Sequence, residues 1–252
     1  MNRLQSPTNV QPGVVPVRSS VDPAACQIEF GRITSDDHLS LSLFAPQHYE
    51  ASYRYPLLIW LHGPAGDERQ LHRVMPLVSL RNYVAVAPRG TQAMSVRGIR
   101  CYDWRQDDQH FAEAEQRIWN AIELAQTRFH IGADRIFLAG LQSGGTMAYR
   151  FAFAHPDALA GVLSIGGPVA TGFASLRRLP ELRRLQFFAT YACEDPDYPP
   201  AAVGADLRLF HAAGMRLHLR QYPGSDALTT EMLADVDRWI MEIVTGVPCE
   251  VC

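Results

Sequence analysis

The segment Gly140-Leu141-Gln142-Ser143-Gly144 has the residue types of a sharp turn that presents one side chain for chemistry. The apolar run RIFLAG precedes it and GTMAYRFAFA follows it, so we expect a strand before the turn and a helix after it. Nucleophilic catalysis at such a turn needs a hydroxyl at the apex, a base within hydrogen-bond reach and a third group that orients the base. The central residue here is Gln142, whose amide nitrogen is not a usable nucleophile, and the neighbouring hydroxyl is that of Ser143.

Two aspartates in predicted loops carry carboxylates that could do chemistry. Asp195 ends a predicted strand in ACEDPDYPP, and Asp226 precedes the last predicted helix in YPGSDALTTEML. If both loops lie beside the turn, the two like charges raise the pKa of one carboxyl or recruit a cation. A second interpretation is an oxygen-rich Ca²⁺ or Mg²⁺ site made by Asp195, Asp226, Glu194 and Asp197. Clustered surface acids are usually solvated, so we expect no metal and no cofactor.

Apolar runs and helical patterns alternate along the rest of the chain. Two alternating stretches near the N-terminus predict an antiparallel pair at a sheet edge, and the continuous apolar runs that follow predict strands covered on both faces. The pattern therefore predicts an α/β fold with a mostly parallel, doubly wound sheet and helices on both faces. The predicted strands are residues 26–33, 39–46, 55–63, 82–90, 134–140, 159–167, 185–192 and 215–224, and the predicted helices are residues 107–129, 146–154, 200–213 and 229–244.

The chain contains no internal repeat and no clear second domain. Residues 1–25 are polar and rich in proline, which predicts a flexible N-terminal arm. Residues 26–246 form the predicted α/β domain, and residues 247–252 form a short C-terminal tail. The tail contains Cys249 and Cys252, which we interpret as free thiols because a C-x-x-C redox pair normally opens a helix.

Three stretches resemble, in chain order, the α/β-hydrolase superfamily, and within it the phospholipase/carboxylesterase (acyl-protein thioesterase-like) group. LLIWLHGPAGDE resembles the strand and loop that supply an oxyanion donor, and RIFLAGLQSGGTMAYRFAFAHPDALAGVLSIGG resembles the nucleophile turn with its helix and next strand. The last stretch, residues 192–240, resembles the acid and histidine loops with the closing helix. The resemblance covers about residues 26–245 and implies the α/β-hydrolase fold.

The resemblance also implies where the catalytic groups would stand, and several of them are replaced. Gln142 occupies the nucleophile position, Asp195 matches the acid, and Asp226 stands where histidine is expected. The oxyanion donors would be the backbone N–H groups of Pro64 and Ser143, but proline has no N–H. Removing one donor typically lowers the rate by about 10²–10³, and removing a nucleophile or base by about 10⁶. We therefore expect conventional Ser-His-Asp hydrolysis to be absent.

Two functions follow from this pattern. The first is a catalytically degenerate α/β-hydrolase that binds a small molecule or a protein. The alternative is an active serine esterase or thioesterase that uses a displaced Ser143 with His218 or His62 as its base. His62 would otherwise be a structural histidine of the pocket. The resemblance places Tyr102 and Trp104 in the loop that walls that pocket, where they either line it or belong to the core.

Composition excludes several other classes of function. The formal net charge is −3, so we expect no nucleic acid as a partner. All 23 basic residues are arginine, which excludes Schiff-base chemistry and a P-loop lysine. No apolar run reaches the ~20 residues of a membrane span. The sequence shows no secretory signal, and its five cysteines are an odd number, so we expect a cytoplasmic protein.

Overall fold

The structure, a computed structural model, describes residues 40–95, 98–170, 178–225 and 228–247. Four features of the sequence lie outside the described residues: the predicted arm of residues 1–25, the predicted strand 26–33, Asp226 and the pair Cys249 and Cys252.

One seven-stranded sheet organises the chain, in the order β1-β3-β2-β6-β7-β8-β9. Its neighbouring strands are parallel except for β1, which is antiparallel to β3. The predicted parallel sheet with an antiparallel N-terminal edge is therefore confirmed. The strands of the sheet are β1 (Leu41–Phe44), β2 (Tyr55–Leu61), β3 (Val84–Pro88), β6 (Ile131–Leu141), β7 (Gly161–Ile165), β8 (Gln186–Ala192) and β9 (Arg216–Tyr222).

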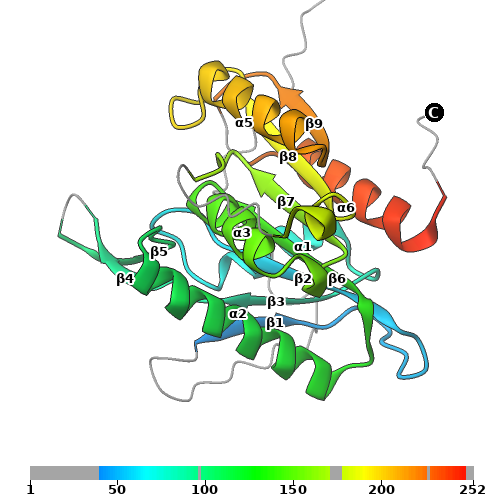
Figure 1. The fold of residues 1–252 in the computed structure, drawn as a ribbon. Helices are drawn as coiled ribbons and strands as arrows, with labels where there is room; N and C mark the ends of the chain where they lie inside the picture. Colours follow the sequence, from blue (N-terminus) through cyan, green and yellow to red (C-terminus); the bar gives the residue numbers. More distant parts are fainter. Residues whose placement is uncertain (1–39, 96–97, 171–177, 226–227, 248–252) are drawn as a thin grey trace, which may run out of the picture.

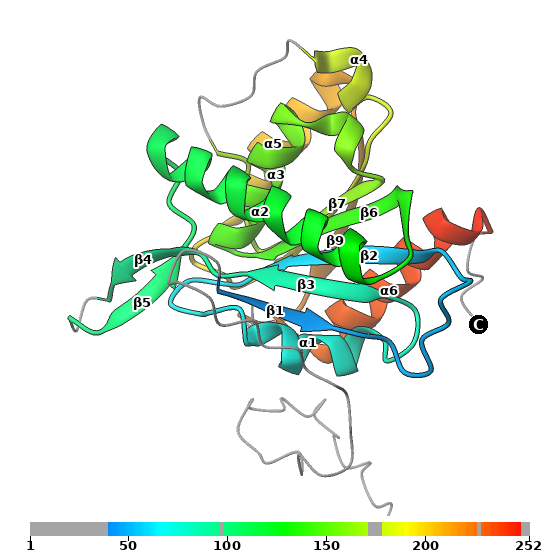
Figure 2. The same cartoon turned by 90° about the horizontal axis from the view of Figure 1, so that it is seen from below.

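Helices cover both faces of this sheet, as Figure 1 and Figure 2 show. In the view of Figure 2, α2, α3 and α5 lie above the sheet and α1 and α6 lie below it. No helix among the described residues is both long and apolar enough to cross a membrane. The helices are α1 (Gln70–Val78), α2 (Asp108–Arg128), α3 (Ser143–Ala154), the 3-10 turn η1 (Pro156–Ala158), α4 (Leu179–Leu182), α5 (Pro200–Ala213) and α6 (Thr230–Thr245).

The central strand β2 shows why a continuous apolar run forms a strand here. Successive side chains point to opposite faces of a sheet. Leu57, Ile59 and Leu61 pack into the core that includes α2 and α3, whereas Leu58 and Trp60 pack into the core that includes α1 and α6. All five side chains are fully buried because helices cover both faces.

The boundaries of the long helices follow local capping chemistry. The carboxylate of Asp107 accepts the backbone N–H of His110 at the start of α2, and the hydroxyl of Thr229 accepts that of Met232 at the start of α6. The helix α6 ends at Gly246, whose φ of 69° lies in the left-handed region that favours glycine. These caps agree with the predicted starts near residues 107 and 229.

The helix α1 and a β-hairpin have no counterpart in the sequence analysis, and neither do the short elements η1 and α4. The helix α1 follows the loop after β2 and contains Pro76. A separate antiparallel hairpin pairs β4 (Thr91–Met94) with β5 (Arg100–Asp103). The hairpin extends away from the sheet in Figure 1, and β5 ends at Asp103.

Candidate functional site

The turn between β6 and α3 has Gln142 at its apex. The residue has φ 48° and ψ −112°, which places it in a region that side-chain-bearing residues seldom occupy. Its N–H donates to the carbonyl of Ile165 at 2.7 Å, and its carbonyl accepts the N–H of Thr146 at 3.0 Å. The apex is therefore held by β7 on one side and by the first turn of α3 on the other.

Glycines on both sides of the apex make this sharp turn sterically feasible. A Cβ on Gly140 would overlap the carbonyl group of Gly144, and a Cβ on Gly144 would overlap the carbonyl oxygen of Leu61. Strand and helix are thus packed backbone against backbone. The two glycines and the backbone angles agree on the same frame, with Gln142 at the centre and Ser143 as the first residue of α3.

The side chain of Gln142 extends between two neighbouring loops. Its Oε1 lies 3.7 Å from the position of a Cβ on Gly63, in the loop after β2. Its Cγ lies 3.7 Å from the corresponding position on Gly166, at the end of β7. A glutamine side chain has the heavy-atom skeleton of a carbamoylated serine with CH₂ in place of the ester oxygen. The carboxamide of Gln142 therefore extends toward the loop that the resemblance assigns to the oxyanion hole.

The hydroxyl of Ser143 is hydrogen-bonded to a carboxylate and not to an imidazole. Its hydroxyl donates to Oδ1 of Asp103 at 2.5 Å. His62, His211 and His218, which lie in the part of the chain that the structure describes, form no hydrogen bond with it. His218 is an exposed residue inside β9, and His211 is an exposed residue on α5.

His62 is buried, and each of its two ring nitrogens forms a hydrogen bond. Its Nε2 accepts the N–H of Gly90 at 2.9 Å, so its Nδ1 carries the proton and donates to the carbonyl of Gly63 at 2.8 Å. Burial lowers the pKa of His62, although the hydrogen bond to Gly63 and nearby acids partly oppose this effect. The neutral ring thus ties the loop after β2 to the chain that follows β3.

The loop after β2 is fixed by a buried ion pair. Pro64 is exposed and adjoins Ala65, whose φ is 55°. Further along the loop, both carboxylate oxygens of Glu68 accept hydrogen bonds from Arg89, each at 2.7 Å. Burial alone would raise the pKa of Glu68, but the hydrogen bonds and charge of Arg89, together with the backbone N–H of Glu68, hold it below its usual range. The ion pair anchors the loop that carries Pro64.

Asp195 lies after β8 and is almost completely buried. Its Oδ1 accepts the N–H of Asp197 at 2.8 Å, and its Oδ2 has no hydrogen-bond partner among the described residues. Oδ2 lies 3.3 Å from the position of a Cβ on Gly166, which is also the neighbour of Gln142. The structure therefore brings Asp195 close to Gln142. Asp226, the other predicted acid, lies outside the described residues.

A pocket of about 260 Å³ opens at the turn, and we call it the elbow pocket. Four of its residues are among the predicted site residues or their neighbours in the predicted acid loop, whereas no motif singles out Gln106 or Thr146. The amide nitrogen of Gln106 donates to the carbonyl of Trp104 at 2.8 Å and to that of Ser143 at 3.4 Å. The elbow pocket is lined by Pro64, Gln106, Gln142, Ser143, Thr146, Gly166, Pro168 and Asp197.

His62, Tyr102 and Trp104 are not among the residues that line the elbow pocket. His62 and Trp104 are buried with ring centroids 5.3 Å apart, so each covers the other. Tyr102 lies under the guanidinium of Arg89, 4.7 Å from ring centroid to Cζ. These aromatic rings support the loops around the elbow pocket without lining it.

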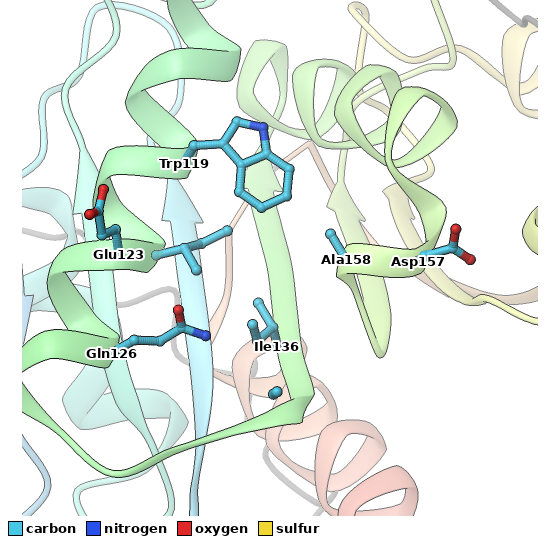
Figure 3. A pocket seen from close by; sticks show the side chains of 8 residues that line it. Trp119, Glu123, Gln126, Ile136, Asp157 and Ala158 are labelled. Atoms are coloured by element: carbon cyan, nitrogen blue, oxygen red, sulfur yellow. The ribbon is translucent and has the colours of Figure 1, made fainter.

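No group of three or more histidine, cysteine, aspartate or glutamate residues in the described ranges is arranged to hold a metal ion. A second pocket, of about 340 Å³, lies between α2, η1 and the first part of β6 (Figure 3). Ile136 in this pocket pairs with Leu57 of β2, whereas the turn at Gln142 follows Leu141 at the other end of β6. The second pocket is therefore separate from the elbow pocket.

The sequence matches no protein-family model, and no curated protein matches it. Several solved structures are similar in fold. A carboxylesterase from Mesorhizobium loti is 17% identical, with 82% of this chain and 97% of that chain covered at a TM-score of 0.67. SOBER1 from Arabidopsis thaliana is 16% identical, with 75% and 99% covered at 0.64. The Bacillus cereus carboxylesterase is 16% identical, with 81% and 94% covered at 0.61. The chain therefore has the α/β-hydrolase fold predicted from its sequence, and the solved structures that it resembles include carboxylesterases and SOBER1.

Proposed function

We propose that this α/β-hydrolase-fold protein does not carry out conventional Ser-His-Asp ester hydrolysis and instead binds a small molecule in the elbow pocket. A pocket of about 260 Å³ suits a small ligand better than a protein segment. Gln142, which stands at the position of the nucleophile in related folds, would then form part of the binding surface.

The main support for this proposal is that Gln142, and not a serine, stands at the apex of the turn. An ester substrate needs a hydroxyl at the apex and free space for its carbonyl at the oxyanion loop. The carboxamide of Gln142 has no nucleophilic oxygen, and its carbonyl end already extends toward Gly63. The side chain therefore occupies the space that an acyl group would take, so that the apex resembles a permanently acylated serine.

Two further replacements support the same conclusion. Pro64 cannot donate a backbone hydrogen bond to an oxyanion. Asp226 stands in the sequence where a histidine base is expected, and an aspartate ordinarily has a pKa of about 3.9 against about 6.5 for histidine. Because losses within a triad do not add, either of the two triad replacements, Gln142 or Asp226, would by itself reduce hydrolysis to near background.

The alternative of a displaced Ser143 nucleophile has less support. Its hydroxyl donates to Asp103, and a carboxylate is a weak general base for a serine hydroxyl at neutral pH. Ser143 also lies in the first turn of α3, one residue past the apex. We interpret its bond to Asp103 as a structural link between α3 and β5.

Hydrolysis of p-nitrophenyl acetate tests the proposal. We expect the wild type and Ser143→Ala to show the same background rate. The double variant Gln142→Ser/Asp226→His should exceed Gln142→Ser alone by about 10²-fold, the contribution of a positioned general base. Turnover by the wild type that disappears in Ser143→Ala would contradict the proposal.

We also propose a cytoplasmic location. Cys101 and Cys193, which lie in the described part of the chain, are free thiols. Free thiols together with an odd total of five cysteines are typical of a reducing compartment.

A further inference from the structure

The elbow pocket has acceptor atoms near its wall that lack donors. Oδ2 of Asp195 belongs to a residue that is only 4% exposed, and it has no partner among the described residues. It faces the corner between Gly166 and Gln142, because an ideal Cβ on Gly166 would lie 3.3 Å from Oδ2 and 3.7 Å from Cγ of Gln142. A buried carboxylate oxygen without a donor is unfavourable, so a donor that reaches this corner would be bound strongly.

Gln106 supplies a second acceptor of the same kind. Its amide nitrogen faces the carbonyls of Trp104 and Ser143, which fixes the orientation of the amide group. Its Oε1 is buried and has no partner in the part of the chain that the structure describes. Gln106 thus carries a buried amide oxygen that lacks a donor and cannot exchange places with the nitrogen.

The hydroxyl donors of the lining are already engaged. Ser143 donates to Asp103 at 2.5 Å, and Thr146 donates to the carbonyl of Pro168 at 2.8 Å. With the nitrogen of Gln106 also bonded, the amide of Gln142 is the side-chain donor that remains among the eight lining residues. Among these side chains and that of Asp195, acceptor atoms without a donor therefore outnumber the free donors.

The charge around the pocket has the sign that suits a cation. Asp197 lines the pocket, Asp195 lies behind its wall, and none of the eight lining residues is basic. The N-terminus of α3 opposes these acids, but a helix end carries only about half a unit of positive charge. Two carboxylates outweigh it, so the local field favours a positive ligand.

We propose that the elbow pocket selects a small organic cation with N–H donors, a primary ammonium compound, whose charged group binds at the corner formed by Asp195, Gln142 and Gly166. This inference rests on the proposed function that the pocket binds a small molecule. The volume of about 260 Å³ limits the ligand to roughly ten non-hydrogen atoms. Because Oδ2 of Asp195 is buried, the Gln142 side chain has to move for the ammonium group to reach it.

A matched set of three probes tests the charge preference by isothermal titration calorimetry at pH 7.5. Benzylammonium, benzyl alcohol and benzoate have nearly the same size but are cationic, neutral and anionic. We expect the wild type to bind benzylammonium about tenfold more tightly than benzyl alcohol, and benzoate most weakly. Binding of the alcohol or of benzoate as tightly as the cation, or binding of none of the three, would overturn the inference.

Two variants connect the preference to the proposed corner. Asp195→Asn keeps the shape of the side chain and an oxygen for the N–H of Asp197, and we expect it to lose most of the benzylammonium preference. Asp197→Asn, at an exposed position that tolerates change, should lose part of it. The control Glu50→Gln removes one exposed acid beyond the opposite end of β2, and it should leave the preference unchanged. An unchanged preference in both aspartate variants would overturn the inference.

The same proteins separate this inference from the proposed function. Wild-type hydrolysis of p-nitrophenyl acetate through Ser143 would defeat the proposed function whatever the ligand preference is. A wild type without hydrolysis that prefers benzoate would leave the proposed function intact and defeat the cation site alone.

Discussion

Gln142 has a positive φ of 48° with ψ −112°, and this conformation is unfavourable for a residue with a Cβ. Strained backbone of this kind costs about 1–3 kcal/mol and persists where the surrounding structure enforces it. Here the packing of Gly140 and Gly144 enforces it. The strain has therefore been retained although the residue at the apex is not a nucleophile.

This strain predicts that Gln142→Gly stabilises the protein. Glycine adopts positive φ without penalty but loses more entropy on folding, so we expect a net gain of about 1 kcal/mol in urea unfolding. Ser143→Gly, one residue later at the start of α3, is the control and should lose about 1 kcal/mol because it removes the bond to Asp103. Equal destabilisation by the two glycine variants would argue against strain at the apex.

His62 predicts a pH dependence of stability. Because burial lowers its pKa, the folded protein keeps the ring neutral while the unfolded chain protonates it below about pH 6.5. The unfolded state then binds more protons, so stability present at pH 7.5 is lost as the pH falls toward 5.5. His62→Gln should remove this contribution, which is at most about 1.4 kcal/mol over one pH unit. The free energy of unfolding in urea is measured at pH 7.5 and 5.5 for both proteins. If the wild type and His62→Gln lost the same stability between these pH values, His62 would not be the group responsible.

At the scale of elements, the pair Glu68–Arg89 fixes the loop after β2 against the end of β3. The two side chains are 4% and 13% exposed, so removing one partner leaves a buried charge. We expect Arg89→Met to destabilise the protein by about 3 kcal/mol. The double variant Arg89→Met/Glu68→Gln should recover part of the loss in a double-mutant cycle, since no unpaired charge remains. A double variant less stable than Arg89→Met would show that the ion pair does not act in this way.

The elements that the sequence predicts well are those with a strong local pattern. The run YPLLIWL gives β2 because both of its faces are covered, and Asp107 and Thr229 mark helix starts through their own capping bonds. The helix α1 was missed because it is short and contains Pro76. The hairpin of β4 and β5 was missed because its strands are short and partly exposed, without a clear alternation.

The site was predictable only where a motif is contiguous in the chain. The flanking glycines place Gln142 and Ser143 in the turn from the sequence alone. The partner of Ser143 is Asp103, which lies 40 residues away on a hairpin that carries no recognisable motif. Gln106 lies in the segment between β5 and α2, so its place at the pocket depends on tertiary packing. Tyr102 and Trp104 belong to the expected loop, but their rings face inward toward Arg89 and His62.

At the scale of the whole molecule, one sheet joins the two apolar cores. Leu57 and Leu58 are adjacent and fully buried, yet they belong to opposite cores. We expect Leu57→Ala and Leu58→Ala each to lower stability by about 2–5 kcal/mol. In both variants, tryptophan fluorescence and circular dichroism should report the same single unfolding transition, shifted to a lower urea concentration. Separate transitions for the two cores would mean that the sheet does not couple them.

The apex of the β6–α3 turn holds an amide, and we propose that no hydroxyl beside it acts as a nucleophile. The most direct measurement is the intact mass of the wild-type protein after incubation with excess fluorophosphonate, with peptide mapping of any adduct. We predict that the mass of the wild-type protein stays unchanged. A stoichiometric adduct on Ser143 would contradict it.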